Sequence, residues 1–480
     1  MKIHPTVSLL ILCLLSISGV FAQSAQIDAI LKREMKERQI PGLQVAVVRQ
    51  GKIILSRSYG LANVEDSIPV SRRSIFAINS CTKAFTGVAV MQLVEEGKID
   101  LSAPISRYLD SLPTEWQPVT IRQLLTHISG LPDMLRVFNP GTHGLAGVGD
   151  EAEVWARTKA MPMDFPTGEE FRYNQTNYVL LGKVIDKFSG EPFARFFRER
   201  QFEPAAMDRT LFADARDVIP GMAGQYRYAN RLDGQSLGED RLLHNYAEFP
   251  SFDRTASGLN STAEDLAQWL IALQNGQLLT KAALKTLWTP GEYNNGNPAQ
   301  WALGWMTKPR SGHPAVMATG GGRSAFFVYP EDDLAIVVLT NLSGASPEDF
   351  IEELAGCYNP EIAGADVVTA LRTAFRRNSV EDVVAIYNGL KKANPGLEPV
   401  ETDLNDWGYR LLSKGRIQEA LAVFKLNVRL FPESWNTYDS YGEALLKNGR
   451  KEEAARMYRK SVEMNPDNLN GKRMLEKMKR

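Results

Sequence analysis

The segment Ser80-Cys81-Thr82-Lys83 pairs a hydroxyl nucleophile with an amine three residues later. On a helix, residues three apart lie on one face, so Ser80 and Lys83 are expected to meet. A serine hydroxyl attacks a carbonyl carbon only when a neighbouring base takes its proton, and a partly desolvated lysine can do this. The motif therefore predicts acyl transfer with Ser80 as nucleophile, although four residues alone also fit an ordinary helix start.

The elements around this motif predict a sheet that is built from both ends of a long region. Four runs have β-strand character: residues 43–48, 52–57, 326–329 and 334–339. The first two are joined at Gln50-Gly51, which predicts a hairpin. Ser80 to Glu96 predicts a helix that stops at Gly97, and residues 100–290 predict helices and loops. We expect an α/β domain whose sheet joins early and late strands, with a helical subdomain inserted.

Near the C-terminus, five residue types recur with a period of 34 residues. Gly408, Gly415, Ala420, Phe424 and Pro432 are followed by Gly442, Gly449, Ala454, Tyr458 and Pro466. This pattern resembles tetratricopeptide repeats, whose paired helices need small residues where they cross and an aromatic side chain between them. An ordinary helical tail is the alternative. Two clear repeats are few for a free-standing solenoid, so we expect an all-α module that packs on the preceding domain and recruits a protein partner.

Further motifs follow one another along residues 27–345. They are SIFAINSCTK at 74–83, IRQLLTHISGLP at 121–132, YNQTNYVLLG at 173–182, ASGLNSTAEDL at 256–266, LGW at 303–305 and Thr319-Gly320-Gly321. Together they resemble the serine β-lactamase-related family, on the branch of class C β-lactamases, D-alanyl-D-alanine carboxypeptidases and related esterases. The resemblance implies a β-lactamase/transpeptidase-like fold, with an antiparallel sheet, flanking helices and an inserted helical subdomain.

The resemblance also implies a role for individual residues. Ser80 matches the acylated nucleophile, Lys83 its proton-sharing partner, and Tyr173 the tyrosine of the family's Y-x-N motif. The backbone N–H groups of Ser80 and Gly321 match the oxyanion hole. A packed aromatic with a satisfied hydroxyl is the alternative for Tyr173. No metal or organic cofactor is implied, and the five histidines show no zinc-ligand spacing.

Two departures from the family's pattern bear on the substrate. Gln175 stands where the Y-x-N motif has Asn, so its amide lies one methylene further out. Ala318-Thr319-Gly320 replaces the family's Lys/His-Thr-Gly, which removes the cation that helps to bind a substrate carboxylate. Arg323 follows closely and is a candidate to replace that charge. We therefore expect weak β-lactam hydrolysis, with substrate contacts from Gln175, Ala318, Thr319, Gly320 and Arg323.

Other residues are assigned to structure rather than to chemistry. His127 is interpreted as a structural histidine that ties a loop, and Cys81 as a small buried residue. Cys81 and Cys357 could form a disulfide in an oxidising compartment. The letters of Gly320–Ala325 fit a dinucleotide motif, but that motif needs a strand followed by a helix, and here strand leads to strand. With 55 Lys+Arg against 56 Asp+Glu, a nucleic-acid partner is disfavoured.

The N-terminus predicts export. Lys2 and His4 precede an apolar run from Val7 to Val20, and Val20-Phe21-Ala22 fits a signal peptidase site. A membrane anchor is the alternative, but the run is shorter than the roughly 20 residues that a span needs. We expect a signal peptide at 1–22, a hydrolase domain at 23–357, a helical linker or degenerate repeat at 358–400 and repeats at 401–480.

These observations predict a secreted or periplasmic serine hydrolase that cleaves ester or amide bonds of a small-molecule or peptide substrate. Two alternatives remain open. One is a peptidase that acts on D-amino-acid peptides of the cell wall. The other is a catalytically silent protein that keeps the fold and recruits partners through its repeats, which Gln175 and Ala318 favour. No nucleic acid and no stable membrane span are expected.

Overall fold

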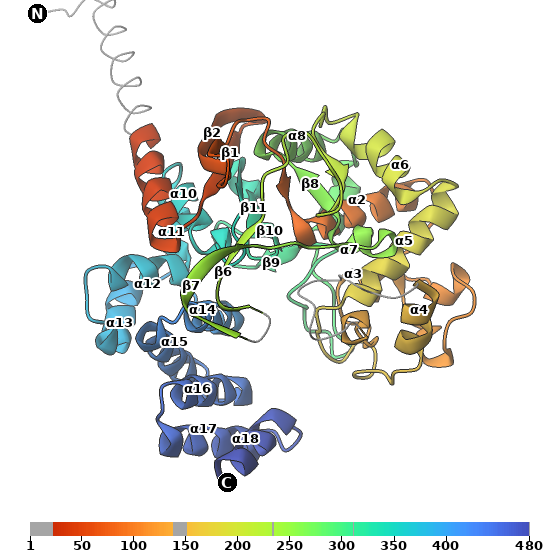
Figure 1. Ribbon diagram of the computed structural model, residues 1–480. Coiled ribbons are helices and arrows are strands. Elements are labelled where there is room, and N and C mark those ends of the chain that lie inside the picture. The colour runs from red at the N-terminus through yellow and green to blue at the C-terminus, as the bar shows by residue number, and fades with distance from the viewer. Residues whose placement is uncertain (1–22, 138–150, 233–234, 311, 480) are drawn as a thin grey trace, which may run out of the picture. The chain divides into compact units, whose positions relative to one another are not determined.

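The computed structural model describes residues 23–137, 151–232, 235–310 and 312–479 (Figure 1). The chain divides into two compact units, one formed by residues 25–309 and 314–351, the other mainly by residues 352–480. The predicted signal peptide at 1–22 lies outside the described residues. Among the helices that are described, none has both the length and the apolar character needed to cross a membrane.

The first unit is built on a seven-stranded sheet with the order β3-β2-β1-β12-β11-β10-β9. Its central strand β1 (Gly42–Arg49) pairs antiparallel with both β2 (Lys52–Asn63) and β12 (Leu334–Thr340). Early and late strands are therefore neighbours, which confirms the predicted α/β architecture. The remaining strands are β3 (Ile68–Pro69), β9 (Met306–Lys308), β10 (Ala315–Gly320) and β11 (Ser324–Tyr329).

The helices of this unit surround one helix that is buried on every side. All residues of α2 (Thr82–Glu95) from Thr82 to Leu93 are buried, because the sequence is apolar or small around the whole helix. It contacts α5 (Gln175–Ser189) and α7 (Arg254–Ser257). The other described α-helices of this unit are α3 (Ile121–Leu125), α4 (Glu151–Lys159), α6 (Phe193–Phe197), α8 (Ala263–Gln274) and α9 (Lys281–Leu287). α2 is thus the central helix of this unit, and the other helices pack around it.

The prediction of helices and loops between residues 100 and 290 was incomplete. A long hairpin, β6 (Tyr226–Leu232) and β7 (Gln235–His244), lies there (Figure 1), and β5 (Leu211–Phe212) and β8 (Leu259–Ser261) join β4 (Phe76–Ala77) in a small sheet. The hairpin is largely exposed and polar, so it carries no apolar alternation. The strands of the small sheet are too short to show a period.

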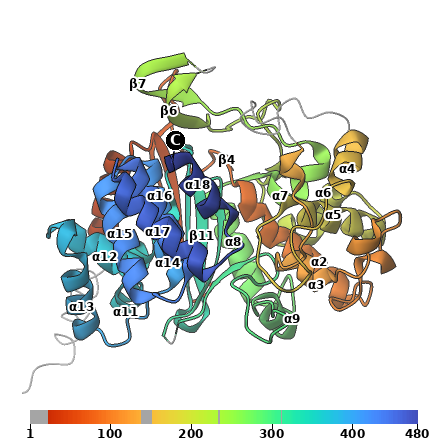
Figure 2. The same cartoon turned by 90° about the horizontal axis from the view of Figure 1, so that it is seen from below.

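The second unit is all-α, as predicted. Its helices are α10 (Ile351–Ala355), α11 (Pro360–Ala365), α12 (Val367–Phe375), α13 (Val383–Ala393), α14 (Glu401–Ser413), α15 (Ile417–Leu430), α16 (Trp435–Lys447), α17 (Lys451–Met464) and α18 (Leu469–Lys479). Consecutive helices from α14 to α17 pack on one another in layers (Figures 1 and 2).

The 34-residue period corresponds to a repeated contact between helices. A Cβ on Gly408 of α14 would lie 2.6 Å from the ring of Phe424 in α15, and one on Gly442 of α16 would lie 3.3 Å from the ring of Tyr458 in α17. Small residue and aromatic ring therefore meet at equivalent crossings, 34 residues apart. The tetratricopeptide identity of these helices stays a prediction.

We expect Gly408→Ala to destabilise the protein even though alanine is the better helix former. The methyl group would overlap Phe424, and overpacking of this kind costs about 1–3 kcal/mol. Gly389→Ala in α13 is the matched control, because no atom lies within 4 Å of its Cβ position, and it should stabilise by up to about 1 kcal/mol. Urea unfolding of both variants measures the two effects. Equal stabilisation by both substitutions would contradict the close crossing.

Candidate active site

Ser80 lies in a one-turn 3-10 helix, η1 (Asn79–Cys81), that leads directly into α2. Asn79 has a φ of +47°, a left-handed conformation that asparagine tolerates better than most residues. Asn79 and Cys81 are buried, whereas Ser80 is partly exposed. The turn therefore presents the Ser80 side chain while it locks both neighbours into the core. Cys81 is a free thiol, as is Cys357, and burial raises the pKa of Cys81.

The Lys83 side chain is fully buried and directed at Ser80. Its Nζ donates hydrogen bonds to Gln175 Oε1 at 2.8 Å and to the Ala256 carbonyl at 2.9 Å, and lies 3.5 Å from Ser80 Oγ. Two positions on Nζ are engaged by the two carbonyls, and the third, a hydrogen in the ammonium and a lone pair in the free amine, faces Ser80 Oγ. Lys83 is thus placed to receive the hydroxyl proton of Ser80.

Gln175 is also a partner of Lys83. Its side-chain carbonyl is occupied by Lys83, so only the NH₂ group of its amide can face a substrate. Gln175 is the first residue of α5, and Asn174 before it caps the helix by accepting a hydrogen bond from the Asn177 amide at 3.3 Å. The N-terminus of α5 therefore delivers residues 173–175 to Lys83.

Tyr173 lies against the same amine. Lys83 Nζ is 4.7 Å from the centre of the Tyr173 ring and 5.2 Å from that of Tyr178, distances at which a cation is attracted to an aromatic face. The rings of His127 and Trp301 pack on Tyr173 with centroids 4.6 and 5.5 Å away. The predicted pair Ser80–Lys83 and the predicted Tyr173 are thus brought together.

His127 supports this cluster from behind. Its ring is fully buried, and Nδ1 accepts a hydrogen bond from the Asn174 amide at 3.1 Å. Burial, reinforced by the charge of Lys83, holds the pKa of His127 well below its ordinary value of 6.5. His127 is therefore neutral, and its geometry agrees with the interpretation of a structural histidine.

Two acidic residues near Lys83 were missed by the sequence analysis. Asp253 is 2% exposed, and its Oδ1 has no hydrogen-bond partner among the described residues. Burial raises the pKa of Asp253 to about 7. The positive charge of Lys83 lowers this pKa, and the negative charge of Asp133 raises it further. Burial also raises the pKa of Asp133, whose Oδ1 accepts from the Leu135 amide at 3.1 Å. Single acids inside irregular segments give no sequence signal.

The turn between β10 and β11 packs directly on η1. A Cβ on Gly320 would overlap the Ile78 carbonyl oxygen and lie 3.1 Å from the Cys81 nitrogen, so only glycine allows this approach. Gly321 follows with a φ of +58°. Within the described part of the chain, neither the Ser80 amide nor the Gly321 amide donates to another group. Both are available to a negative oxygen beside Ser80.

The other residues predicted to contact the substrate, Ala318, Thr319 and Arg323, differ in burial and in hydrogen bonding. Ala318 is 4% exposed and belongs to the main apolar core, so no polar side chain faces the site from that residue. Thr319 is partly exposed, with Oγ1 3.8 Å from Met306 Sδ. Arg323 is buried, and its Nη1 donates to Gln225 Oε1.

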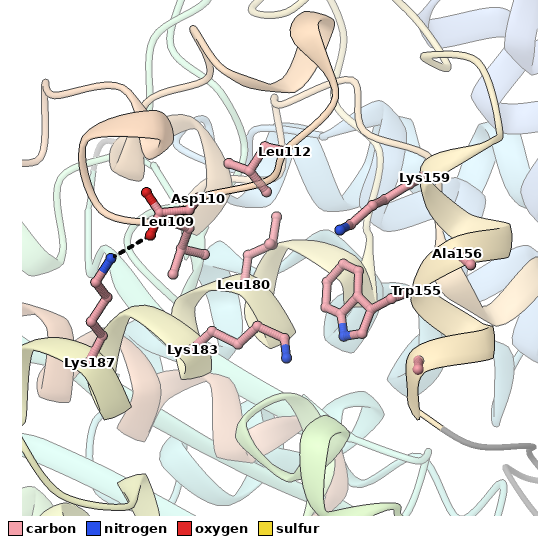
Figure 3. Close-up of a pocket in the computed structure, with 10 residues that line it drawn as sticks. Leu109, Asp110, Leu112, Trp155, Ala156, Lys159, Leu180, Lys183 and Lys187 are labelled. Atoms are coloured by element: carbon pink, nitrogen blue, oxygen red, sulfur yellow. Dashed lines mark hydrogen bonds and ion pairs between the residues drawn. The ribbon is translucent and has the colours of Figure 1, made fainter.

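A separate pocket lies on another face of α5 (Figure 3). It has a volume of about 590 Å³ and is lined by Leu109, Asp110, Leu112, Ala152, Trp155, Ala156, Lys159, Leu180, Lys183 and Lys187. Its lysines are already engaged: Lys187 pairs with Asp110 at 3.1 Å, Lys183 with Glu151 at 2.5 Å, and Lys159 donates to the Ser111 carbonyl at 3.0 Å. None of the residues around Ser80 lines it, so the acyl chemistry is assigned to the Ser80 site.

Comparison with known proteins agrees with this geometry. The family model for beta-lactamase matches residues 27–355. The chain belongs to the beta-lactamase family. Its β-lactamase/transpeptidase-like fold, predicted from sequence, is confirmed.

Several relatives of this beta-lactamase-family chain are known. Penicillin-binding protein 4* of Bacillus subtilis is 28% identical over 284 residues, 58% of this chain and 62% of the relative. Protein flp of Staphylococcus aureus strain MW2 is 26% identical over 338 residues, 68% of this chain and 65% of the relative. The chain thus spans less than two thirds of the length of both of these curated relatives.

Solved structures show the same fold. The octameric penicillin-binding protein homologue from Pyrococcus abyssi is 26% identical, with a TM-score of 0.59, over 69% of this chain and 77% of that one. D-amino acid amidase from Ochrobactrum anthropi SV3, complexed with L-phenylalanine amide, is 22% identical, with a TM-score of 0.60, over 71% and 99%. The amidase likeness shows the fold alone.

We expect His127 to make the protein less stable as the pH falls below 6.5. The pKa of His127 is lower in the folded state than in the unfolded chain, so the unfolded chain binds a proton there at higher pH. Below pH 6.5 this proton uptake lowers the free energy of unfolding by up to about 1.4 kcal/mol per pH unit. His127→Gln should remove this component. Because the raised pKa of Asp253 acts in the opposite direction, the measurement is the difference between variant and wild type in urea unfolding at pH 7.5 and 5.5. Parallel changes in His127→Gln and wild type would contradict the assignment.

Proposed function

We propose that this chain is a secreted or periplasmic serine hydrolase that cleaves ester or amide bonds through an acyl-Ser80 intermediate. The observation that carries the proposal is the placement of Lys83. Its Nζ is hydrogen-bonded to two carbonyl oxygens and lies 3.5 Å from Ser80 Oγ. Membership of the beta-lactamase family supports a serine hydrolase. Export is supported by the signal-like sequence at residues 1–22.

In the acylation step, Lys83, acting in its amine form, takes the hydroxyl proton as Ser80 Oγ bonds to the substrate carbonyl carbon. The carbonyl π electrons move to oxygen, and the Ser80 and Gly321 amides donate to the resulting oxyanion. Each such donor contributes about 3 kcal/mol to the stability of the transition state. When the oxyanion collapses, the bond to the leaving group breaks, and the proton passes from Lys83 to that group. Tyr173, packed on the amine, is the proposed second member of this proton path.

In the deacylation step, water takes the place of the leaving group. Lys83 removes a proton from the water molecule as the water oxygen attacks the acyl carbon. Ser80 Oγ recovers a proton when the ester bond breaks. The two steps together consume one water and release an acid and an alcohol or amine. No group outside the described residues is needed for the balance of atoms.

A peptidase acting on D-amino-acid peptides is the second candidate. It uses the same acyl-Ser80 chemistry, and the penicillin-binding protein relatives favour it. We further propose that α14–α17 bind a protein partner as tetratricopeptide-like repeats, which the matched Gly408–Phe424 and Gly442–Tyr458 crossings support.

We expect Ser80→Ala to abolish hydrolysis of a small activated ester and covalent labelling by a fluorophosphonate or a penicillin. The reason is that Oγ is the atom that bonds to the acyl carbon. Ser106→Ala, at an exposed serine, is the matched control and should keep both. Mass spectrometry of the labelled peptide identifies the modified residue. Labelling that persists in Ser80→Ala would refute the assignment, and a wild type that neither labels nor hydrolyses would favour a silent binding protein.

We expect Lys83→Ala and Tyr173→Phe each to lower kcat/KM by roughly 10²–10⁴-fold, the range for lost acid–base catalysis. Because the two groups serve one proton path, the double variant should lose far less than the product of the single losses. Steady-state kinetics on one activated ester tests this, with melting temperatures as the control for folding. Fully multiplicative losses would show that Lys83 and Tyr173 act independently.

A further inference from the structure

The pocket lined by α4 and α5 has a volume of about 590 Å³, within the range of roughly 300–1,000 Å³ that is typical of small-molecule sites (Figure 3). Its lining residues on α4 share one helical face: Ala152, Trp155, Ala156 and Lys159. Those on α5 also share one face: Leu180, Lys183 and Lys187. The third wall is formed by Leu109, Asp110 and Leu112. Two helix faces and a loop thus surround a space that no side chain of the described residues fills.

Most of the surface that faces this pocket is apolar. Leu180 is buried, and Leu109 and Leu112 are only partly buried. Ala152 and Ala156 are exposed, and because their side chains end at Cβ, α4 leaves the space open. Apolar surface that stays in contact with water favours a ligand that covers it.

Three lysines make the pocket positive. Lys159, Lys183 and Lys187 line it, against the single carboxylate of Asp110, and Glu151 beside it raises the count to two carboxylates. The carboxylates are well exposed, with 88% for Asp110 and 41% for Glu151, so their ion pairs with the lysines are weak. Among the described residues each lysine donates one of its three hydrogens. Donors therefore remain for an anion that enters from outside.

The ammonium groups and the apolar surface lie next to each other. Lys183 Nζ is 5.1 Å from the centre of the Trp155 ring, so the charge from α5 stands over an apolar side chain from α4. Lys159 reaches toward the same space from the other wall, and its Nζ donates to the Ser111 carbonyl at 3.0 Å (Figure 3). A ligand held here meets two ammonium groups at one end and an indole and leucines along its length.

We infer that this pocket binds a fatty carboxylate, with the carboxylate between Lys159 and Lys183 and the alkyl chain against Trp155 and the leucines. The excess of ammonium groups favours an anionic head, because hydrogen bonds between two charged groups are the stronger ones. The volume suits a molecule with one chain. The inference goes beyond the Ser80 chemistry and does not depend on it, since none of the residues around Ser80 lines the pocket.

The first test compares decanoate, 1-decanol and decylammonium by isothermal titration calorimetry on the full chain. Decanoate should bind at least about tenfold more tightly than decanol, and decylammonium more weakly than decanol, because only the head group differs. Replacing both Lys159 and Lys183 by Met keeps their apolar stems and removes the charges. This double variant should raise the Kd of decanoate at least tenfold and that of decanol less than about twofold. Lys98→Met, at an exposed lysine paired with Glu96 and outside the pocket, is the matched control and should change neither value.

The second test fills the pocket from an exposed position. Ala156→Trp adds an indole to the lining without removing a core atom, and it should raise the Kd of decanoate and of decanol at least tenfold. Ala282→Trp, at an exposed alanine of α9 outside the pocket, should leave both unchanged. Melting temperatures show whether the variants fold. Hydrolysis of an activated ester by Ala156→Trp should equal that of the wild type.

Four results would overturn the inference. Decanoate that does not bind the wild type would show that the pocket takes no fatty carboxylate. Equal affinity for decanoate and decanol would remove the role of the lysines. Decanoate binding that survives in a folded Ala156→Trp would place the ligand elsewhere. Sedimentation of the protein with phosphatidylglycerol vesicles, abolished by Ala156→Trp and without decanoate binding, would assign the pocket to a lipid surface.

Discussion

The interaction on which the site depends is the burial of the Lys83 amine between two carbonyl oxygens. A buried lysine is costly unless its hydrogens are accepted, and here Gln175 and the Ala256 backbone accept them. These partners are 92 and 173 residues away along the chain, so α2, α5 and α7 must all be in place before the amine is satisfied. The helices that bury Lys83 therefore also direct its Nζ at Ser80, so folding and the placement of the base depend on the same contacts.

A second constraint joins the sheet to this helical cluster. The pairing of β1 with β12 fixes β11 and β10 beside them, and β10 ends at Gly320, against the carbonyl of Ile78. Any side chain at that glycine would push the turn away from η1 and separate the Gly321 amide from Ser80. The nucleophile thus comes from the helical side and one oxyanion donor from the sheet side.

Much of this arrangement follows from patterns that a sequence displays. Ser80 and Lys83 could be paired because the spacing of three is a helical period, and β1 and β12 could be placed in one sheet because both are short, mainly apolar runs. The contact of Gly408 with Phe424 could be anticipated from a 34-residue recurrence. What could not be predicted depends on tertiary burial. The Ala256 acceptor is a backbone carbonyl, which every residue has. Asp253 becomes distinctive only because the fold buries it.

The residues expected to contact the substrate also show how far their surroundings depend on tertiary packing. The amide of Gln175 is expected to contact the substrate, and no sequence pattern indicated that its carbonyl oxygen also accepts a hydrogen bond from Lys83. Ala318 was correctly seen to lack a charge, but its place in the apolar core depends on the packing of β10 and not on the residue type.

Charged groups near Ser80 can stabilise the charges that form during acyl transfer. The buried guanidinium of Arg323 lies beside Gly321, on the side where the oxyanion develops. Asp133 and Asp253 lie close enough to Lys83 to interact with its charge. Ionised carboxylates there favour the ammonium that forms when Lys83 takes the Ser80 proton, and the guanidinium favours the negative oxygen. Since burial raises the pKa of Asp253 to about 7, this second contribution is gained or lost around neutral pH. The electrostatic asymmetry of the site is thus built from groups that touch neither the nucleophile nor the scissile bond, and it supports the direction of proton transfer that the positions of Ser80 and Lys83 require.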